Sequence, residues 1–342
     1  MQPSSIAPSN PPALAEGIGE IVRPLAAHFA ALDDFLEDQV AAFEPEVQPL
    51  VRYTFQHSGK KIRPILVFFA GWSETEAQSP SADLVCGAAI VELVHLATLV
   101  HDDILDGAAV RHRMATAAEK YGSPSAVLLG DALFAHALRL AAGFPNVEVC
   151  RAVATATRQV CSGEIVQTLS KRELRVDFAH YYRVIDLKTA ELFAVSAHLG
   201  AFLGRSSAEF DMAATTFARK LGIAYQIYDD LTDVVGQESK TGKTLGTDLA
   251  GGKPTLPLLL LLRALPGKSA DELQARLLQG HTRPGDLEDL FRQHRIIEQV
   301  RDQFETILQE GEAALAAFAD NPAVPRLLEL SSFIRQAMRR QG

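Results

Sequence analysis

The chain has 342 residues, with 33 Lys and Arg against 42 Asp and Glu, which gives a formal net charge of −9. This length supports one large core without a second domain, and the negative charge excludes a general affinity for nucleic acid. Only three cysteines occur, Cys86, Cys150 and Cys161. They form no CxxC pair and lie in apolar segments, so we expect reduced thiols in the core rather than a disulfide framework.

We expect residues 1–15 to form a disordered lead and residues 16–342 to form a single domain. The lead is rich in Ser, Pro, Asn and Ala, without a positive start or an apolar run, which suits neither a signal peptide nor a transit sequence. The longest weakly charged stretches, Ala190 to Gly204 and Pro254 to Leu262, are too short or too Gly/Pro-bounded to span a bilayer. These features predict a cytoplasmic protein without a transmembrane segment.

Apolar residues recur at helical spacing almost throughout the chain, whereas strand-like alternation is scarce. Breaks fall where Gly, Pro and Ser gather, for example at residues 122–124, 143–146 and 204–207. The segments between breaks are roughly 12 to 30 residues long, which suits helices around a central cavity. The pattern therefore predicts an all-α, single-domain helical bundle. We expect the Ala/Leu-rich part from about Ala264 onward to be a peripheral helical cap.

The first basic cluster is Gly59-Lys60-Lys61-Ile62-Arg63-Pro64, which places three cations at a predicted helix boundary. Arg63 offers a bidentate fork and Lys60 a mobile point charge, which suits a diphosphate. A solvated charge run is the alternative. His95 lies seven residues before Asp102, so the two side chains share one helix face.

Two acidic clusters end apolar segments of the chain. In His101-Asp102-Asp103-Ile104-Leu105-Asp106, helical geometry places Asp102 and Asp106 on one face, one turn apart. The same DDxxD spacing returns in Asp229-Asp230-Leu231-Thr232-Asp233, with Gln226 near that face. One such cluster alone would be read as solvated surface as readily as a metal site. The second copy favours a functional site.

Carboxylates at the C-terminal end of a helix are unfavourable unless a cation compensates them. Mg²⁺ binds a few carboxylates and completes its octahedron with water and phosphate oxygens. Two acidic faces that oppose one another would hold several such ions around one diphosphate, so the sequence predicts Mg²⁺ as cofactor. A Gly- and Lys-rich segment, Gly236 to Thr255, follows the second cluster, and its Lys243 and Lys253 are placed to close over a metal-bound phosphate. An ordinary surface loop is the alternative.

Six motifs occur in one order along the chain: GKKIRP, HLATLVHDDILD, GEIVQ, KTAELF, YQIYDDLTD and GKTLGTDLAGGKPTLP. In these motifs the sequence resembles the trans-isoprenyl diphosphate synthases, densely from about Gly59 to Pro257 and more loosely outside. The resemblance implies condensation of isopentenyl diphosphate with an allylic diphosphate, an all-helical fold and a homodimer. In that reaction the allylic C–O bond ionises, and no protein nucleophile is needed.

The resemblance also implies roles for individual residues. The Mg²⁺ ligands would be Asp102, Asp106 and Asp229, with Asp103, Asp230 and Asp233 as further catalytic carboxylates. The contacts to the allylic diphosphate would be Arg111, Lys188, Lys243 and Lys253, and those to isopentenyl diphosphate would be Lys60, Arg63 and His95. Thr189 and Gln226 would face the developing allylic cation.

One position departs from the family pattern. Many members have two adjacent arginines after the first aspartate motif, whereas this chain has Arg111-His112-Arg113. His112 falls where the second arginine would contact isopentenyl diphosphate, and a ring nitrogen donates at most one hydrogen bond where a guanidinium offers a fork. The resemblance therefore predicts weaker binding of that substrate, or a shifted role for Arg113.

Product length is expected to depend on the residues below the first motif, where family members that stop early carry a bulky aromatic residue. Here Ala97 and Thr98 are small, so we expect a product of geranylgeranyl length or longer, with Phe134 as a deeper floor. Two alternatives remain. A class I terpene cyclase would need neither the second motif nor GKKIRP, and a non-catalytic partner subunit should have lost metal ligands.

Overall fold

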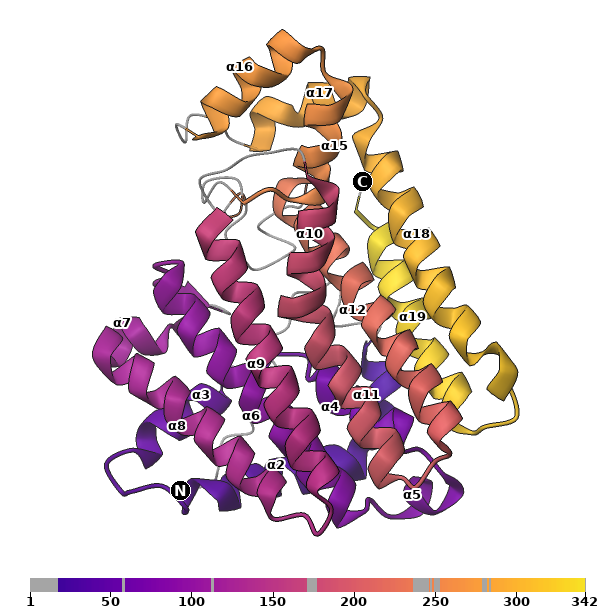
Figure 1. Cartoon of the computed structure of the whole chain (residues 1–342). Coiled ribbons are helices and arrows are strands. Elements are labelled where there is room, and N and C mark those ends of the chain that lie inside the picture. The colour runs from indigo at the N-terminus through magenta and orange to yellow at the C-terminus, as the bar shows by residue number, and fades with distance from the viewer. Residues whose placement is uncertain are drawn as a thin grey trace.

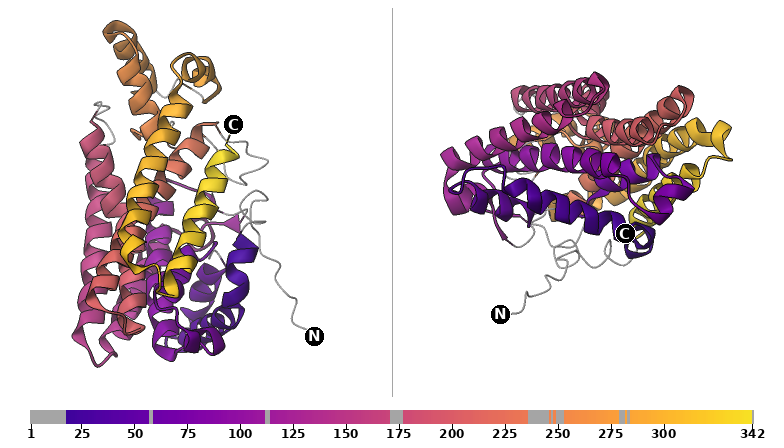
Figure 2. Two further views of the ribbon diagram at one scale, coloured as in Figure 1. Left: turned by 90° about the vertical axis from the view of Figure 1, so that its right-hand side faces the viewer. Right: turned by 90° about the horizontal axis from the view of Figure 1, so that it is seen from below.

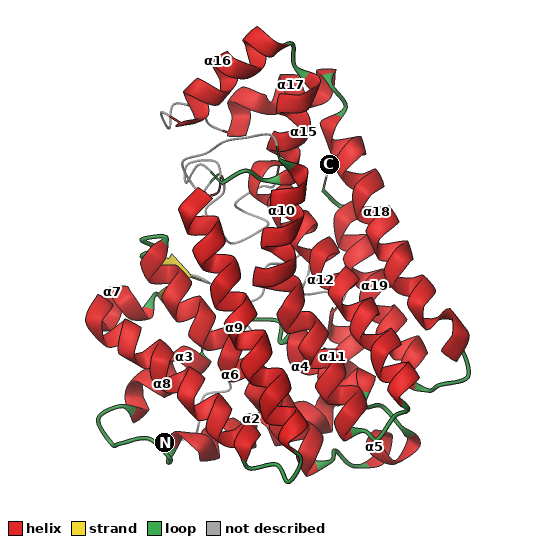
Figure 3. Ribbon diagram, in the orientation of Figure 1, coloured by secondary structure: helices red, strands yellow, loops and turns green. Residues whose placement is uncertain are grey.

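In this computed structural model the chain is described at residues 18–56, 59–111, 114–170, 177–235, 246, 248, 253–278, 282 and 284–341. The predicted lead of residues 1–15 lies outside these ranges. Helices account for nearly all of the regular structure in the described part, and one two-stranded ribbon pairs Arg111 with Met114 (Figure 3). The all-α prediction is confirmed.

Figure 1 shows the arrangement of the elements. In chain order they are η1 (Arg23–Leu25), α2 (Ala26–Val40), α3 (Gln48–Phe55), α4 (Ile62–Ala70), α5 (Glu74–Gln78), α6 (Ala82–Leu105), β1 (Val110–Arg111), β2 (Met114–Ala115), α7 (Ala117–Tyr121), α8 (Ser123–Ala142), α9 (Val147–Ser170), α10 (Phe178–Ile185), η2 (Asp186–Ala190), α11 (Glu191–Leu203), α12 (Ala208–Val235), α15 (Leu256–Ala264), α16 (Gly267–Leu278), η3 (Pro284–Leu287), α17 (Glu288–Gln293), α18 (Ile296–Leu315), η4 (Ala316–Phe318) and α19 (Ala323–Arg339).

The core lies around α6, which packs against α2, α4, α8 and α11, while α12 packs against α11 and α18. Ser81 starts α6 by accepting a hydrogen bond from the Leu84 backbone N–H, a standard N-cap. The predicted breaks at residues 143–146 and 204–207 separate α8 from α9 and α11 from α12. The first acidic motif lies at the C-terminal end of α6, and the second lies in the C-terminal part of α12.

The predicted peripheral cap is only partly correct. Figure 1 shows α16 and α17 at one end of the molecule, as a cap would be. In contrast, α18 packs along α12, and α18 and α19 run side by side (Figure 2). Val300, Phe304 and Leu308 of α18 are buried. They recur every four residues, which is the helical stripe of a core-facing helix; the low aromatic content of this region obscured it.

Two further expectations need correction. All three cysteines are free, but Cys161 is exposed and Cys86 and Cys150 are half-buried, so the core position was wrong. The longest apolar segments are α6 and α8 rather than the two stretches named from the sequence, and by length and composition each could cross a membrane. In α6, 72% of the apolar window is buried inside the protein, as in a core helix, against 39% in α8.

Candidate active site

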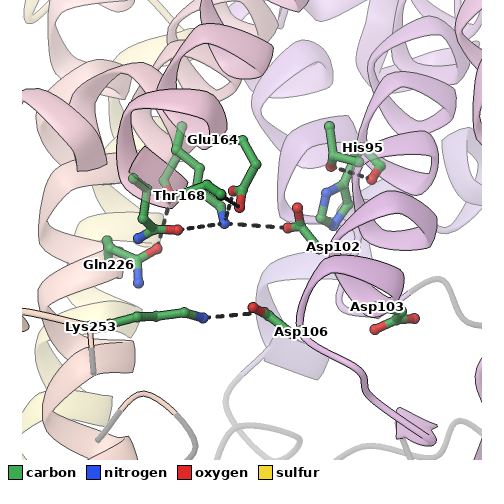
Figure 4. A network of polar contacts seen from close by, with 12 residues as sticks. His95, Asp102, Asp103, Asp106, Glu164, Thr168, Gln226 and Lys253 are labelled. Carbon is green, nitrogen blue, oxygen red and sulfur yellow. Dashed lines mark hydrogen bonds and ion pairs between the residues drawn. The ribbon is translucent and has the colours of Figure 1, made fainter. Parts of the chain in front are cut away.

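The first aspartate motif lies in the last turn of α6. Asp102 and Asp106 point to the same side of the helix end, as their spacing predicted, whereas Asp103 points away from them (Figure 4). Gly107 follows with φ of 63°, a left-handed conformation that ends the helix and suits glycine. His95 precedes Asp102 by two turns on α6 (Figure 4). Burial raises the pKa of Asp102, and the nearby Lys188 ammonium opposes that effect.

Asp103 is paired with Arg111 of the β1–β2 ribbon. Its carboxylate is buried, Oδ1 accepts a hydrogen bond from Arg111 Nε at 2.7 Å, and Arg111 Nη2 forms an ion pair with the same oxygen at 2.7 Å. Arg111 was predicted to contact an allylic diphosphate; here it holds the ribbon against the motif. His112 and Arg113 lie outside the described residues, so the departure from the family pattern stays a prediction.

The second motif, at the end of α12, also divides its carboxylates. Asp230 is 3% exposed, and it accepts hydrogen bonds from Tyr181 Oη at 2.7 Å and from Gln226 Nε2 at 2.8 Å. Burial, followed by the charge of Asp248, raises the pKa of Asp230 to about 7, while these two donors oppose the rise. Asp230 therefore orients Gln226. Tyr181 was not predicted, because no local pattern indicates a partner 49 residues away.

Thr189 and Gln226 are in direct contact, as expected for a pair that works together. Thr189 Oγ1 donates to Gln226 Oε1 at 2.8 Å. Because the amide N–H₂ of Gln226 already donates to a carboxylate, its carbonyl oxygen must point toward Thr189. Both side chains thus have fixed orientations.

Lys188 connects three elements at this site. Its Nζ contacts Glu164, donates to Gln167 Oε1 at 3.0 Å, and lies 3.6 Å from Asp102 Oδ2. Glu164 and Gln167 come from α9, on one face, one turn apart. Both residues belong to the GEIVQ motif, but the sequence alone indicated no role for either of them. The ammonium of Lys188 compensates the acidic end of α6.

Lys253 joins the two aspartate motifs. Its Nζ lies 3.2 Å from Asp106 Oδ2 and 3.1 Å from Asp248 Oδ1, while the backbone N–H of Asp248 donates to Asp233 Oδ2 at 3.1 Å. Burial lowers the pKa of Lys253, but the carboxylates of Asp248 and Asp106 outweigh burial and raise it. Lys253 therefore remains charged. Lys243, predicted to act with it, lies outside the described residues.

The basic residues at the start of α4 have different surroundings. Lys61 pairs with Asp33 of α2 and is thereby used structurally. Arg63 points inward, with its guanidinium carbon 5.1 Å from the Phe193 ring centroid and its Nε buried without a hydrogen-bond partner among the described residues. A buried donor that lacks an acceptor is costly, so an anionic ligand at this position would be favourable. Lys60 precedes α4 and is half-buried.

No group of three or more His, Cys, Asp or Glu side chains in the described ranges is close enough to hold a metal ion by itself. The three predicted ligands come from two helices: Asp102 and Asp106 end α6, beside Lys188 and Lys253, and Asp229 lies in the C-terminal part of α12. That donor set fits Mg²⁺, which keeps several waters and shares its remaining positions with substrate phosphates.

Residues 44–294 match the sequence profile of the family described as polyprenyl synthetase. The chain belongs to this family. It is an enzyme, a trans-prenyltransferase of the kind that makes linear polyprenyl diphosphates. It is 31% identical over 263 residues to an all-trans-nonaprenyl-diphosphate synthase (geranyl-diphosphate specific) of Rhodobacter capsulatus, covering 77% of this chain and 80% of the relative.

Two other similarities bear on product and fold. A geranylgeranyl diphosphate synthase of Methanosarcina mazei is 34% identical over 233 residues, which covers 66% of this chain and 70% of the relative. The crystal structure of a Caulobacter crescentus polyprenyl synthase, complexed with calcium and isoprenyl diphosphate, superposes with a TM-score of 0.85 at 28% identity, over 95% of this chain and 98% of that one. Relatives of this chain thus make products of different lengths.

Proposed function

We propose that this enzyme joins isopentenyl diphosphate head to tail to an allylic diphosphate, with Mg²⁺ as cofactor. The observation that carries the proposal is the chain of contacts from Asp106 through Lys253 and Asp248 to Asp233, because it brings both acidic motifs and a charged lysine to one place. An allylic diphosphate leaves readily only when its growing negative charge is stabilised.

Asp102, Asp106 and Asp229 would hold the Mg²⁺. When bound, the metal would neutralise the negative charge of the leaving diphosphate. Lys188 and Lys253 would bind the same diphosphate as point charges, once their present carboxylate partners are shared with metal. Arg111 would do so after leaving Asp103. Lys243 and His112 are proposed as further diphosphate contacts on the evidence of sequence alone.

Arg63, with Lys60 and His95, would hold isopentenyl diphosphate. The buried Nε of Arg63 provides a donor for which a diphosphate oxygen is a fitting acceptor. Thr189 and Gln226 would place their oxygens near the developing allylic cation, since the Asp230 carboxylate fixes the Gln226 amide in that orientation. These residues bind and orient; none needs to form a covalent bond with substrate.

The proposed product is an all-trans diphosphate of geranylgeranyl length or longer. Ala97 and Val94 lie below the motif on α6 and carry no aromatic ring. Phe134 is not the deeper floor that the sequence suggested, because its ring centroid lies 5.7 Å from that of His101, beside the motif. The relatives named for nonaprenyl and geranylgeranyl products are consistent with this range.

We further propose a cytoplasmic homodimer that forms through α8 and the outer face of α9. Val127 and Leu128 of α8 and Ile165 and Leu169 of α9 are large apolar side chains that are exposed in the single chain. A second copy of the chain would cover them, as apolar faces of this kind mark association surfaces. Light scattering should give twice the chain mass, and Leu128→Lys should shift it toward the monomer. A monomeric wild type would contradict this assembly.

The test of the reaction is product analysis. Purified protein is incubated with labelled isopentenyl diphosphate, Mg²⁺ and each allylic primer in turn, and the products are dephosphorylated and sized. Linear prenyl alcohols of twenty or more carbons are expected. Cyclic hydrocarbons, or no elongation with any primer, would overturn the proposal.

A further inference from the structure

The segment that carries Lys188 and Thr189 is a π-helical turn. The helix from Phe178 to Leu203 is α-helical on both sides, as α10 and α11, but its centre, η2, has the wider π geometry. Such turns are rare, cost stability relative to an α-helix, and occur frequently at functional sites. Something in the surrounding structure must therefore hold η2 in this form.

One face of α12 contacts η2 at three successive levels. Arg219, Gly222 and Gln226 lie at spacings of three and four, so they share that face. Arg219 donates from Nη1 to Asp186 Oδ1 at 2.8 Å and from Nη2 to Glu191 Oε2 at 2.5 Å. Asp186 opens the π-turn and Glu191 directly follows it. A single guanidinium therefore holds both ends of η2.

Two glycines let the neighbouring helices pack directly against the backbone of η2, which leaves the turn little space to shift. A Cβ at Gly222 would lie 2.7 Å from the Cα of Ala190, and a Cβ at Gly163 of α9 would lie 2.8 Å from the backbone N of Lys188. The backbone of η2 is thus in close contact with α12 on one side and α9 on the other. Movement of the turn along the helix axis is opposed by the Arg219 contacts at its two ends.

We propose that Arg219 is a positioning residue that holds η2 so that Lys188 and Thr189 point into the active site. The inference rests on the proposed roles of those two residues. A planar guanidinium presents two donors at a fixed separation, so Arg219 sets the spacing of Asp186 and Glu191, whereas an ammonium is a single point charge without that fork. Among the described residues, Arg219 forms its ion pairs with Asp186 and Glu191, neither of which is proposed to bind substrate, so its effect on the site passes through the turn.

The adjacent residue provides a matched control. Lys220 is the next residue of α12, and Arg219 and Lys220 both line a pocket of about 770 Å³ between α10, α12 and α18. Its Nζ pairs with Glu310 of α18 at 2.6 Å rather than with η2. Loss of either cation removes ion pairing of α12, but only the two pairs of Arg219 involve the turn that carries Lys188.

The variants are chosen so that folding survives. Removing the charge at Arg219 would leave the buried Glu191 uncompensated, which is costly. Arg219→Lys keeps a charge there and loses the fork. Asp186→Ala releases the other end of the turn, where the side chain is 36% exposed. Lys220→Gln is the control, and Lys188→Met tests the proposed site itself.

Steady-state kinetics with both substrates and thermal unfolding are measured for each variant. Arg219→Lys and Asp186→Ala should lower kcat, on the order of tenfold for the former, and raise KM for the allylic substrate, because misplacement of about 1 Å is enough for such losses. KM for isopentenyl diphosphate should not change, since Lys60, Arg63 and His95 lie on other elements. Lys220→Gln should behave as wild type.

Wild-type kinetics in both Arg219→Lys and Asp186→Ala, with Lys188→Met inactive, would overturn the positioning role and leave the proposed site intact. An equal rise of KM for both substrates, with a lower unfolding temperature, would also overturn it, because that is the result of a merely structural ion pair. Wild-type activity of Lys188→Met would overturn the proposed site and the inference with it.

Discussion

Lys253 Nζ lies between two carboxylates, 3.2 Å from Asp106 Oδ2 and 3.1 Å from Asp248 Oδ1. This lysine follows the second aspartate motif in sequence but contacts the first motif in space. Without metal or substrate, its ammonium compensates the negative charge of these two carboxylates. The two neighbouring carboxylates favour the charged form of Lys253, although its side chain is largely buried.

Lys253→Gln should raise KM for the allylic diphosphate and lower kcat/KM about 10- to 100-fold, because one charge-assisted hydrogen bond is worth about 1.5–3 kcal/mol. Lys220→Gln, which removes a lysine paired to Glu310 far from the motifs, is the control. Equal kinetics for wild type and Lys253→Gln would show that Lys253 only stabilises the fold.

Tyr181→Phe removes one donor to Asp230 and loosens the orientation of Gln226. We expect kcat to fall on the order of tenfold, in proportion to one hydrogen bond with a charged partner. Tyr182→Phe is the matched control, since the Tyr182 hydroxyl donates to Gln303 of α18 instead. Similar kcat values in the two variants would argue against a role for Tyr181 at the site.

Ala97→Phe should shorten the product by at least one isoprene unit while the first condensations continue. Ala97 is 0% exposed, so the new ring also costs about 1–3 kcal/mol of folding stability through overpacking. Ala337→Phe is the control, because Ala337 is also buried but belongs to α19 rather than to α6. Product chains that stay unchanged in Ala97→Phe, or shorten equally in both variants, would contradict the proposed tail path.

His198 gives the fold a pH dependence apart from the site. A hydrogen bond from Nδ1 to Asp211 raises the pKa of His198 above its ordinary value of 6.5, burial opposes the rise, and Asp211 and Glu148 add to it through their charges. Because the folded pKa is the higher one, this stabilisation is complete below about pH 6.5 and is lost as pH rises through the folded pKa.

His198→Gln should therefore lower the free energy of unfolding by roughly 1–2 kcal/mol at pH 6, with a smaller difference at pH 9. Urea unfolding at both pH values measures it. Asp211→Asn should give the same trend, and the double variant should lose less than the sum of the two. A difference that does not vary with pH would show that His198 contributes only by packing.

Local patterns in the sequence were sufficient for the fold class and for the shared orientation of Asp102 and Asp106 at the end of α6. Helical periodicity predicted the bundle, and the DDxxD spacing placed Asp102 and Asp106 together because one turn separates them. The same geometry could not show that Asp103 and Asp230 turn toward Arg111 and Tyr181. Those pairings depend on how distant segments pack.

The parts that sequence missed share this cause. Arg219, Glu164 and Tyr181 each act on a residue from another helix, so no spacing along one helix indicates them. The π-turn η2 has no recognised sequence signal, and its close neighbours Gly163 and Gly222 appear in sequence as ordinary helical glycines. The buried stripe of α18 was visible in principle, at Val300, Phe304 and Leu308, but low aromatic content was given more weight.

If the aspartates of both motifs hold metal for the allylic diphosphate, Asp102→Asn and Asp229→Asn must each impair the Mg²⁺-dependent incorporation of isopentenyl diphosphate, and the rate of that incorporation is the measurement to make. Each variant should lose at least about 100-fold in rate, as when a leaving group is no longer stabilised, and a chelator should abolish wild-type activity. Asp289→Asn, at an exposed aspartate of α17, should not change the rate. A near-normal rate in either Asp102→Asn or Asp229→Asn would contradict the metal-binding role of these aspartates.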